Sequence, residues 1–178
     1  MKERPILFSA PMVRAILVGT KTQTRRVVKL GPSGRAHFGG RNWHLGDPDV
    51  IKACPYGQLG DRLWVREAWM PVEHDSQPVR YRASNPSYAG KWRPSIHMPR
   101  WASRILLEIG SVRVERLLDI SEADAEAEGV DFIRRVPDVD ETMTAVELYE
   151  ALWESINGPG SWDANPFVWC VEFKRVQP

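Results

Sequence analysis

The sequence predicts an α+β fold, a small mixed β-barrel with helices at its rim. Several short stretches alternate apolar and polar residues, as half-buried strands do, whereas only three stretches have helical periodicity. These strands and helices do not alternate regularly along the chain, which disfavours a parallel α/β sheet. The 178 residues suffice for a real core and show neither an internal repeat nor a domain boundary. We therefore expect one domain over residues 1–178.

The N-terminal elements are a short apolar strand over residues 5–9 and the helix that follows it. Ser9 is a preferred N-cap residue, and Gly19 is a preferred residue just past a helix end. The apolar positions of this helix are Met12, Val13, Ile16 and Leu17. Because the valines after Arg26 favour extended chain, we expect the polar residues 19–26 at a helix-to-strand junction.

Two irregular segments, near residues 30–59 and 70–101, lack periodicity and are expected to be long loops or insertions. In the second segment, Trp92 and Trp101 flank a stretch that mixes Arg, Pro and His. These two tryptophans are candidates for stacking on bases. The alternative is that they fill the core, as most of the eight tryptophans are expected to do.

The middle strands are predicted over residues 61–69 and 79–82, and as a hairpin that turns at Gly110-Ser111. Within the first of these, Glu67 falls in phase with Leu63 and Val65. A buried carboxylate is costly unless it is paired. Glu67 is therefore either a strand-end glutamate bonded to an arginine or a residue of a ligand site.

The C-terminal part contains two helices with capping boxes and a final strand over residues 167–173. Ser121 begins the first of these helices and Thr144 the second, each with an acidic partner three residues later. Glu128 is the last helical residue before Gly129, where the helix dipole disfavours an anion by roughly 0.3–1 kcal/mol. A residue that breaks a local rule is a candidate for function. The alternative is a solvated glutamate that tolerates this small cost.

Composition and charge exclude several classes of protein. The net charge of +1 makes no case for nucleic acid, although residues 1–35 are mostly basic and residues 115–154 mostly acidic. No apolar run is long enough to span a bilayer, and the two cysteines form no pair motif. The four histidines have no metal-ligand spacing. We expect a cytoplasmic protein without metal or membrane contact, and a monomer because no heptad repeat argues for assembly.

The polar cluster at residues 19–26 suggests acid–base chemistry. A desolvated Lys21 loses its proton more easily and can act as a base, with Thr24 as the nucleophile. Arg25 or Arg26 can hold a carboxylate, a phosphate or a carbonyl. The alternative is an exposed basic junction without a site, because Lys-x-x-Thr occurs by chance in many chains.

The motif Gly-x-Lys-x-x-Thr-x-Arg at residues 19–26 resembles the GxKxxExR signature of the ASCH domain, a relative of the PUA fold. Thr24 stands where that signature has Glu. The sequence instead resembles a bacterial branch, the N4-acetylcytidine amidohydrolases, in its Lys21, Thr22, Thr24 and Arg26. The branch's catalytic Glu matches Glu128. Residues 60–69, 92–104 and 162–175 further resemble phage- and prophage-associated ASCH proteins.

This resemblance implies a PUA-like barrel and an amidohydrolase that removes an acyl group from the N4 amine of cytidine or a related nucleoside. It implies Lys21 as the base, Thr24 as the nucleophile or as the residue that positions a water, and Glu128 as the proton donor. No metal or organic cofactor is implied. The expected substrate-binding residues are Arg26, Thr22, Arg25, Glu67, Trp92 and Trp101. Two alternatives are a module that binds RNA or a modified base in the same cleft, with the surface of residues 21–29 on phosphate, and an RNA-cleaving protein.

Overall fold

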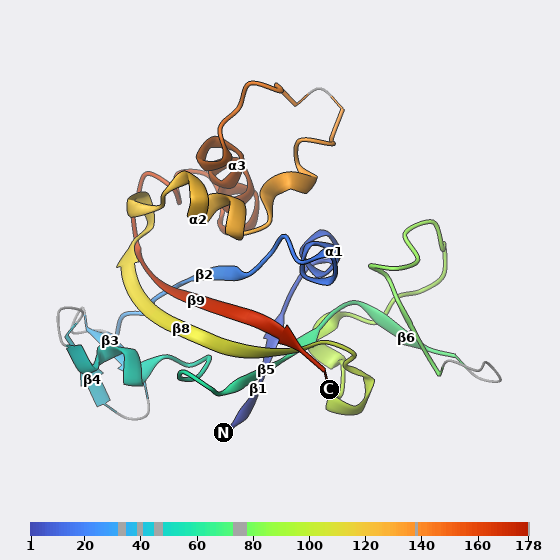
Figure 1. Ribbon diagram of the computed structural model, residues 1–178, viewed down its shortest axis with the longest axis horizontal. Coiled ribbons are helices and arrows are strands. Elements are labelled where there is room, and N and C mark those ends of the chain that lie inside the picture. Colours follow the sequence, from blue (N-terminus) through green and yellow to red (C-terminus); the bar gives the residue numbers. More distant parts are fainter. Residues whose placement is uncertain (32–34, 39–40, 45–47, 73–77, 138, 178) are drawn as a thin grey trace.

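The computed structural model describes residues 1–31, 35–38, 41–44, 48–72, 78–137 and 139–177. Its centre is a curved five-stranded sheet (Figure 1). In spatial order, the strands are β1 (Glu3–Leu7), β5 (Arg62–Arg66), β8 (Leu106–Arg116), β9 (Phe167–Val176) and β2 (Gln23–Val27). β1 and β5 are parallel, and the other neighbours are antiparallel. The α+β class is confirmed.

The predicted barrel is wrong in one respect, because the sheet is open. β1 and β2 are its edges, and no strand pairing joins them among the described residues. The chain between them forms α1 (Ala10–Val18), which packs Met12 and Val13 into the main core. Among the described residues, one side-chain hydrogen bond joins the two edge strands, from Arg26 Nη2 to the Leu7 carbonyl (3.1 Å). The two edge strands are therefore joined by side chains and not by strand pairing.

The predicted hairpin at Gly110-Ser111 is also wrong. β8 continues through these residues and pairs with β9 from Leu106 to Arg116, with a shift of register between Ile109 and Ser111. Glycine inside a strand often marks a β-bulge, and Gly110 is the extra residue here. The long strand β9 pairs with β8 on both sides of the bulge, so the chain continues as one strand instead of turning.

The helices begin and end where their capping residues predict. Ser9 and Gly19 flank α1, although the Ser9 side chain makes no capping hydrogen bond. Complete capping boxes open the other two helices, α2 (Glu122–Ala127) and α3 (Ala145–Asn157). No helix among the described residues has the length and apolar character needed to cross a bilayer.

Both irregular segments contain short elements, and residues 32–34, 39–40, 45–47 and 73–77 within them lie outside the described residues. Two small ribbons pair β3 (Ala36–Phe38) with β4 (Arg41–Trp43), and β6 (Trp69–Pro71) with β7 (Val79–Tyr81). The predicted strand near residues 79–82 is thus confirmed as β7. The short 3-10 helices are η1 (Pro48–Ala53), η2 (Ser95–His97), η3 (Arg100–Ala102), η4 (Leu117–Asp119) and η5 (Val130–Phe132).

Three apolar clusters hold these elements together. The main core lies between the sheet and α1, and a second core joins α2 and α3 to β9 through residues such as Leu148 and Val168. A small third cluster, centred on Trp69 and Met98, lies under the β6–β7 ribbon. The link between α1 and β2, residues 19–22, contacts the end of α2. There, Lys21 forms an isolated β-bridge with Glu128.

Gly129 should be indispensable to this junction. Its φ is +79°, and a Cβ there would lie 2.7 Å from the Lys21 Cβ and 3.0 Å from the Ala15 Cβ. Gly19 has a φ of +85° but nothing within 4 Å, so it is a matched control. We expect Gly19→Ala to lower the free energy of unfolding in urea by about 1 kcal/mol, through backbone strain alone. Gly129→Ala should cost about 1–3 kcal/mol more. Equal losses would contradict the close packing.

Candidate functional site

The first three residues of β2 are polar and buried, so an exposed basic junction is the wrong interpretation. Gln23, Thr24 and Arg25 are each exposed by no more than 2%, and the Lys21 residue just before the strand by 3%. Successive residues of a strand point to opposite faces. Thr24 is in register with Val171 of β9, on the main-core face, whereas Arg25 is in register with Cys170 on the face that α2 covers.

Lys21 has partners for all three protons of its ammonium group. Its Nζ donates to the Gln23 carbonyl (2.7 Å), the Glu128 carbonyl (2.8 Å) and Glu128 Oε2 (2.9 Å). Burial lowers the pKa of Lys21 below its usual value, and the nearby guanidinium groups of Arg26 and Arg25 act in the same direction. Glu128 opposes them but does not cancel the effect of burial. Burial therefore makes Lys21 easier to deprotonate than an exposed lysine.

Glu128 is buried, with 2% exposure, so a solvated glutamate is the wrong interpretation. It caps the C-terminus of α2, where the dipole is unfavourable, but both carboxylate oxygens face cations. Oε2 accepts from Lys21, and Oε1 accepts from Arg25 Nη1 (3.2 Å). These two charge-assisted bonds outweigh the small dipole cost.

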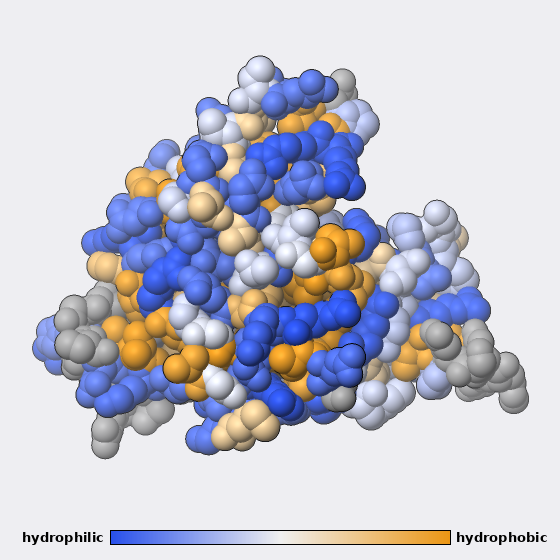
Figure 2. All heavy atoms as spheres, in the orientation of Figure 1, coloured by the Kyte–Doolittle hydropathy of each residue, from blue (hydrophilic) through white to orange (hydrophobic). Residues whose placement is uncertain are grey.

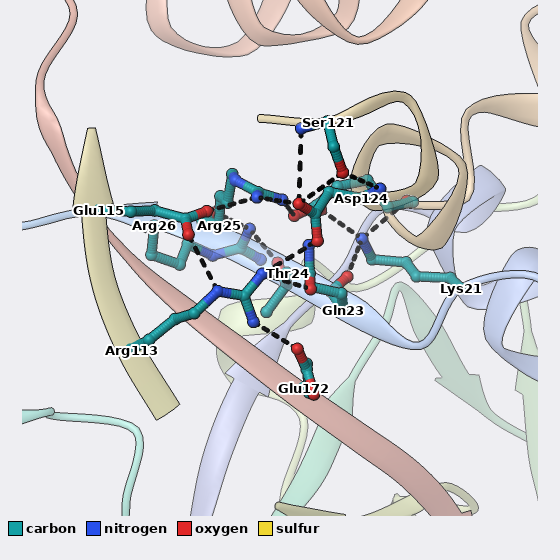
Figure 3. A network of polar contacts seen from close by, with 11 residues as sticks. Lys21, Gln23, Thr24, Arg25, Arg26, Arg113, Glu115, Ser121, Asp124 and Glu172 are labelled. Atoms are coloured by element: carbon teal, nitrogen blue, oxygen red, sulfur yellow. Dashed lines mark hydrogen bonds and ion pairs between the residues drawn. The ribbon is translucent and has the colours of Figure 1, made fainter. Parts of the chain in front are cut away.

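Arg25, which pairs with Glu128, belongs to a larger network of ion pairs. The network reaches Arg113 and Glu172 through Glu115 and Asp124 (Figure 3). Arg25 Nη2 pairs with Glu115 and lies 3.4 Å from Asp124 Oδ2. Arg113 in turn pairs with Glu115, with Asp124 (2.9 Å) and with Glu172. Sequence reasoning missed Arg113 and Glu115 as parts of the site. Their alternation with the valines of β8 indicated one polar face, but not which helix would cover it.

A pocket of about 310 Å³ lies where the sheet fails to close. Phe8, at the end of β1, and residues of β2 line one side, and α3 lines the other. Lys21 and Arg26 both lie over the Phe8 ring, at 5.6 Å and 5.3 Å from its centroid. The pocket thus combines apolar and aromatic walls with ionic groups. Its lining residues are Leu7, Phe8, Ser9, Met12, Lys21, Arg25, Arg26, Val27, Glu128, Tyr149, Leu152, Trp153, Ile156 and Asn157.

The structure brings Lys21, Glu128, Arg25 and Arg26 together in the pocket wall, but Thr24 is not a lining residue. The Thr24 hydroxyl is fully buried and accepts a hydrogen bond from Arg26 Nη1 (2.8 Å), whereas the Lys21 ammonium donates elsewhere. Thr24 therefore contacts Arg26, which lines the pocket, without lining the pocket itself.

The remaining candidate residues lie outside the pocket. Thr22 is exposed on a separate hollow that it shares with Asp124. Glu67 is buried and receives two hydrogen bonds from Arg104 (2.9 and 3.1 Å), which confirms the arginine-bonded interpretation. Burial raises the pKa of Glu67, although Arg104 lowers it. Trp92 packs edge-on against Tyr88, and Trp101 packs against Trp69, away from the pocket.

No protein-family model and no curated protein matches the chain. Among solved structures, the fold is similar to that of an ASCH domain from Lactobacillus crispatus JV V101. The two share 13% identity with a TM-score of 0.48 over 99% of this chain and 81% of the other. The fold is also similar to that of a protein from Enterococcus faecalis V583 described by the family model DUF984. The two share 10% identity with a TM-score of 0.48 over 99% of this chain and 82% of the other. At such values, these similarities carry no information about the ligand or the reaction.

Arg25 should be essential to the stability of the site. Arg25→Met removes a buried cation from Glu128, Glu115 and Asp124, and breaking a buried ion pair costs about 3–5 kcal/mol. Arg135 is a matched control, because its side chain is 79% exposed and its one ion pair with a described residue is to Asp131. We expect Arg135→Met to cost less than about 1 kcal/mol. Urea unfolding measures both losses, and two proteins of equal stability would contradict the role of Arg25.

Proposed function

We propose that the protein is a metal-independent hydrolase that removes an acyl group from the N4 amine of cytidine or a related nucleoside. The observation that carries this proposal is the buried Lys21–Glu128 pair in the wall of the pocket. Amide hydrolysis needs a base for the attacking group and an acid for the leaving amine. A lysine with a lowered pKa, bonded directly to a carboxylate, supplies both in one pair.

The size and the lining of the pocket support a small substrate with an aromatic ring. Its volume of about 310 Å³ is at the small end of the range of about 300–1,000 Å³ that is typical of small-molecule sites. Phe8, Tyr149 and Trp153 contribute aromatic faces, on which a pyrimidine ring can stack. Arg26 adds a donor that can bind the acyl oxygen and stabilise the negative charge that develops there.

In such a reaction, Lys21 and Glu128 can accept and donate every proton that is transferred. Lys21 first passes one ammonium proton to Glu128, which leaves a neutral amine beside a neutral carboxylic acid. The amine then takes a proton from the attacking water, and Glu128 gives its proton to the departing N4 nitrogen. The products are the free carboxylic acid and the amine, and the pair returns to its ionic form. Burial assists the first step because it disfavours charged groups.

The position of Thr24 favours water as the nucleophile over its own hydroxyl. Lys21 lines the pocket and Thr24 does not. The hydrogen bond from Arg26 to the Thr24 hydroxyl (2.8 Å) instead makes Thr24 a positioning residue, which fixes the guanidinium at the pocket. In the other route, the Thr24 hydroxyl attacks the carbonyl and forms an acyl-enzyme ester that water then hydrolyses.

The direct test is conversion of N4-acetylcytidine to cytidine, followed by chromatography. We expect turnover by the unaltered protein and a loss of about 10²–10⁴-fold in Lys21→Met, because the base is removed. Lys29 is exposed and outside the pocket, so Lys29→Met is the matched control and should retain full activity. Circular dichroism verifies that both variants are folded.

Two further variants separate the roles within the site. Glu128→Gln keeps the size of the side chain but cannot carry the proton, so its turnover should fall as far as that of Lys21→Met. Thr24→Val should retain measurable turnover if water attacks, and none if the hydroxyl is the nucleophile. No conversion by the unaltered protein, or full conversion by Lys21→Met, would contradict the proposal.

A further inference from the structure

The hydroxyl group of Tyr149, in the wall of the pocket, has no hydrogen-bond partner among the described residues. Tyr149 is 4% exposed, and a buried tyrosine normally finds a partner for its O–H group. Tyr81 follows this rule, because its hydroxyl donates to the Ala102 carbonyl (2.9 Å). A phenylalanine at position 149 would fill the same space without leaving a polar group unpaired. Packing alone therefore does not account for this hydroxyl.

The Tyr149 oxygen also keeps contact with open space. Within the described chain, the side-chain atoms that have neither a partner nor access to solvent are Arg25 Nε, Arg62 Nε, Trp69 Nε1 and Ser161 Oγ. The Tyr149 oxygen is not one of these atoms. Its ring packs against those of Trp153 and Trp162, with centroids 6.1 and 6.2 Å away, and the residue lines the pocket. The open space next to its hydroxyl is therefore the pocket.

Tyr149 lies at the inner end of the pocket, as the Lys21–Glu128 pair does. Exposure along the lining face of α3 rises from 4% at Tyr149 to 65% at Ile156, two turns later. Lys21 and Glu128 are exposed by no more than 3%, so they belong to the same inner end. Charges on Glu128 and Arg26 also act on the Tyr149 hydroxyl. The outer surface of the region of α2 and α3 is, in contrast, mostly hydrophilic (Figure 2).

This environment makes Tyr149 a neutral donor. Burial raises the pKa of Tyr149 well above its usual value, and the Glu128 carboxylate acts in the same direction. The phenol therefore keeps its proton at neutral pH and adds no charge to the pocket. A fixed donor of this kind binds most strongly to an oxygen on which negative charge develops. In amide hydrolysis, that atom is the acyl oxygen.

We propose that the Tyr149 hydroxyl donates a hydrogen bond to the acyl oxygen of the substrate and, together with Arg26, stabilises the oxyanion that forms when water attacks. This inference rests on the proposed hydrolase function and adds a catalytic residue to it. The phenol gives up no proton, and the proton transfers stay with Lys21 and Glu128. The carbonyl on the pyrimidine ring is another acceptor, but it lies farther from the N4 nitrogen that Glu128 must reach.

The experiment compares Tyr149→Phe with Tyr81→Phe, each of which removes one hydroxyl. Steady-state kinetics with N4-acetylcytidine give kcat and KM for both variants and for the unaltered protein. The matched ligand is N4-ethylcytidine, which has a CH2 group in place of the acyl carbonyl and is measured as a competitive inhibitor. Urea unfolding measures the stability of the same three proteins.

We expect Tyr149→Phe to lower kcat by about 10²-fold or more, because one oxyanion donor is lost. KM should change by less than about tenfold, since a hydrogen bond to the uncharged carbonyl contributes little. The inhibition constant of N4-ethylcytidine should not change. The stability of Tyr149→Phe should match that of the unaltered protein, whereas Tyr81→Phe should be less stable but fully active, because its hydroxyl binds the Ala102 carbonyl and not the substrate.

Three results would overturn the inference while leaving the hydrolase in place. The first is an unchanged kcat in Tyr149→Phe. The second is an equal weakening of N4-ethylcytidine binding, which would place the hydroxyl on the nucleoside instead of the acyl oxygen. The third is a loss of stability in Tyr149→Phe as large as that in Tyr81→Phe, which would show that the hydroxyl supports the fold.

If the unaltered protein does not hydrolyse N4-acetylcytidine, the proposed function fails, and calorimetry then measures the Kd of both compounds directly. Weaker binding by Tyr149→Phe of the acetyl compound alone would still support the contact with the acyl oxygen. Equal effects on the two compounds, or no binding of either by the folded protein, would overturn the inference as well.

Discussion

The rest of the site depends on one buried contact, the ion pair between Lys21 and Glu128. It joins the turn after α1 to the end of α2, two segments more than a hundred residues apart in the chain. Burying two charges is expensive, and the attraction between them repays the cost only when the remaining donors and acceptors are satisfied. Here the ammonium has three acceptors, and the carboxylate has a second cation in Arg25. The ion pairs that Arg25 forms with Glu115 and Asp124 thus hold its guanidinium beside Glu128.

Because the sheet is open, the ion pair between Lys21 and Glu128 lies beside a pocket. A closed barrel would fill the space between the first and last strands with a hydrogen-bonded ladder. In this protein, the edges of β1 and β2 are bridged by side chains, and the pocket occupies the gap with α3 across it. The ionic groups meet aromatic walls there. Because Lys21 and Glu128 are buried, the interaction between them is stronger than one between exposed charges.

Local sequence signals predicted much of the fold. Both capping boxes open helices as expected, and Glu128 and Glu67 stood out because each carboxylate breaks a local pattern. The misjudged features depend on distant residues. Whether Gly110 makes a turn or a bulge depends on β9, more than fifty residues later in the chain. The burial of Arg25 likewise depends on Glu115, Asp124 and the cover of α2, none of which is local to it.

The central claim is that burial makes the neutral amine of Lys21 accessible. The most direct measurement is a pH titration of the side-chain Nζ signals by NMR in protein labelled with ¹⁵N-lysine, which has six lysines. The Lys21 signal is assigned by its absence from the Lys21→Met protein. The account predicts that this signal titrates below the usual value of 10.5, with slowly exchanging protons, while exposed lysines titrate near that value. A Lys21 that stays charged at and above 10.5 would show that Glu128 outweighs burial and would contradict the account.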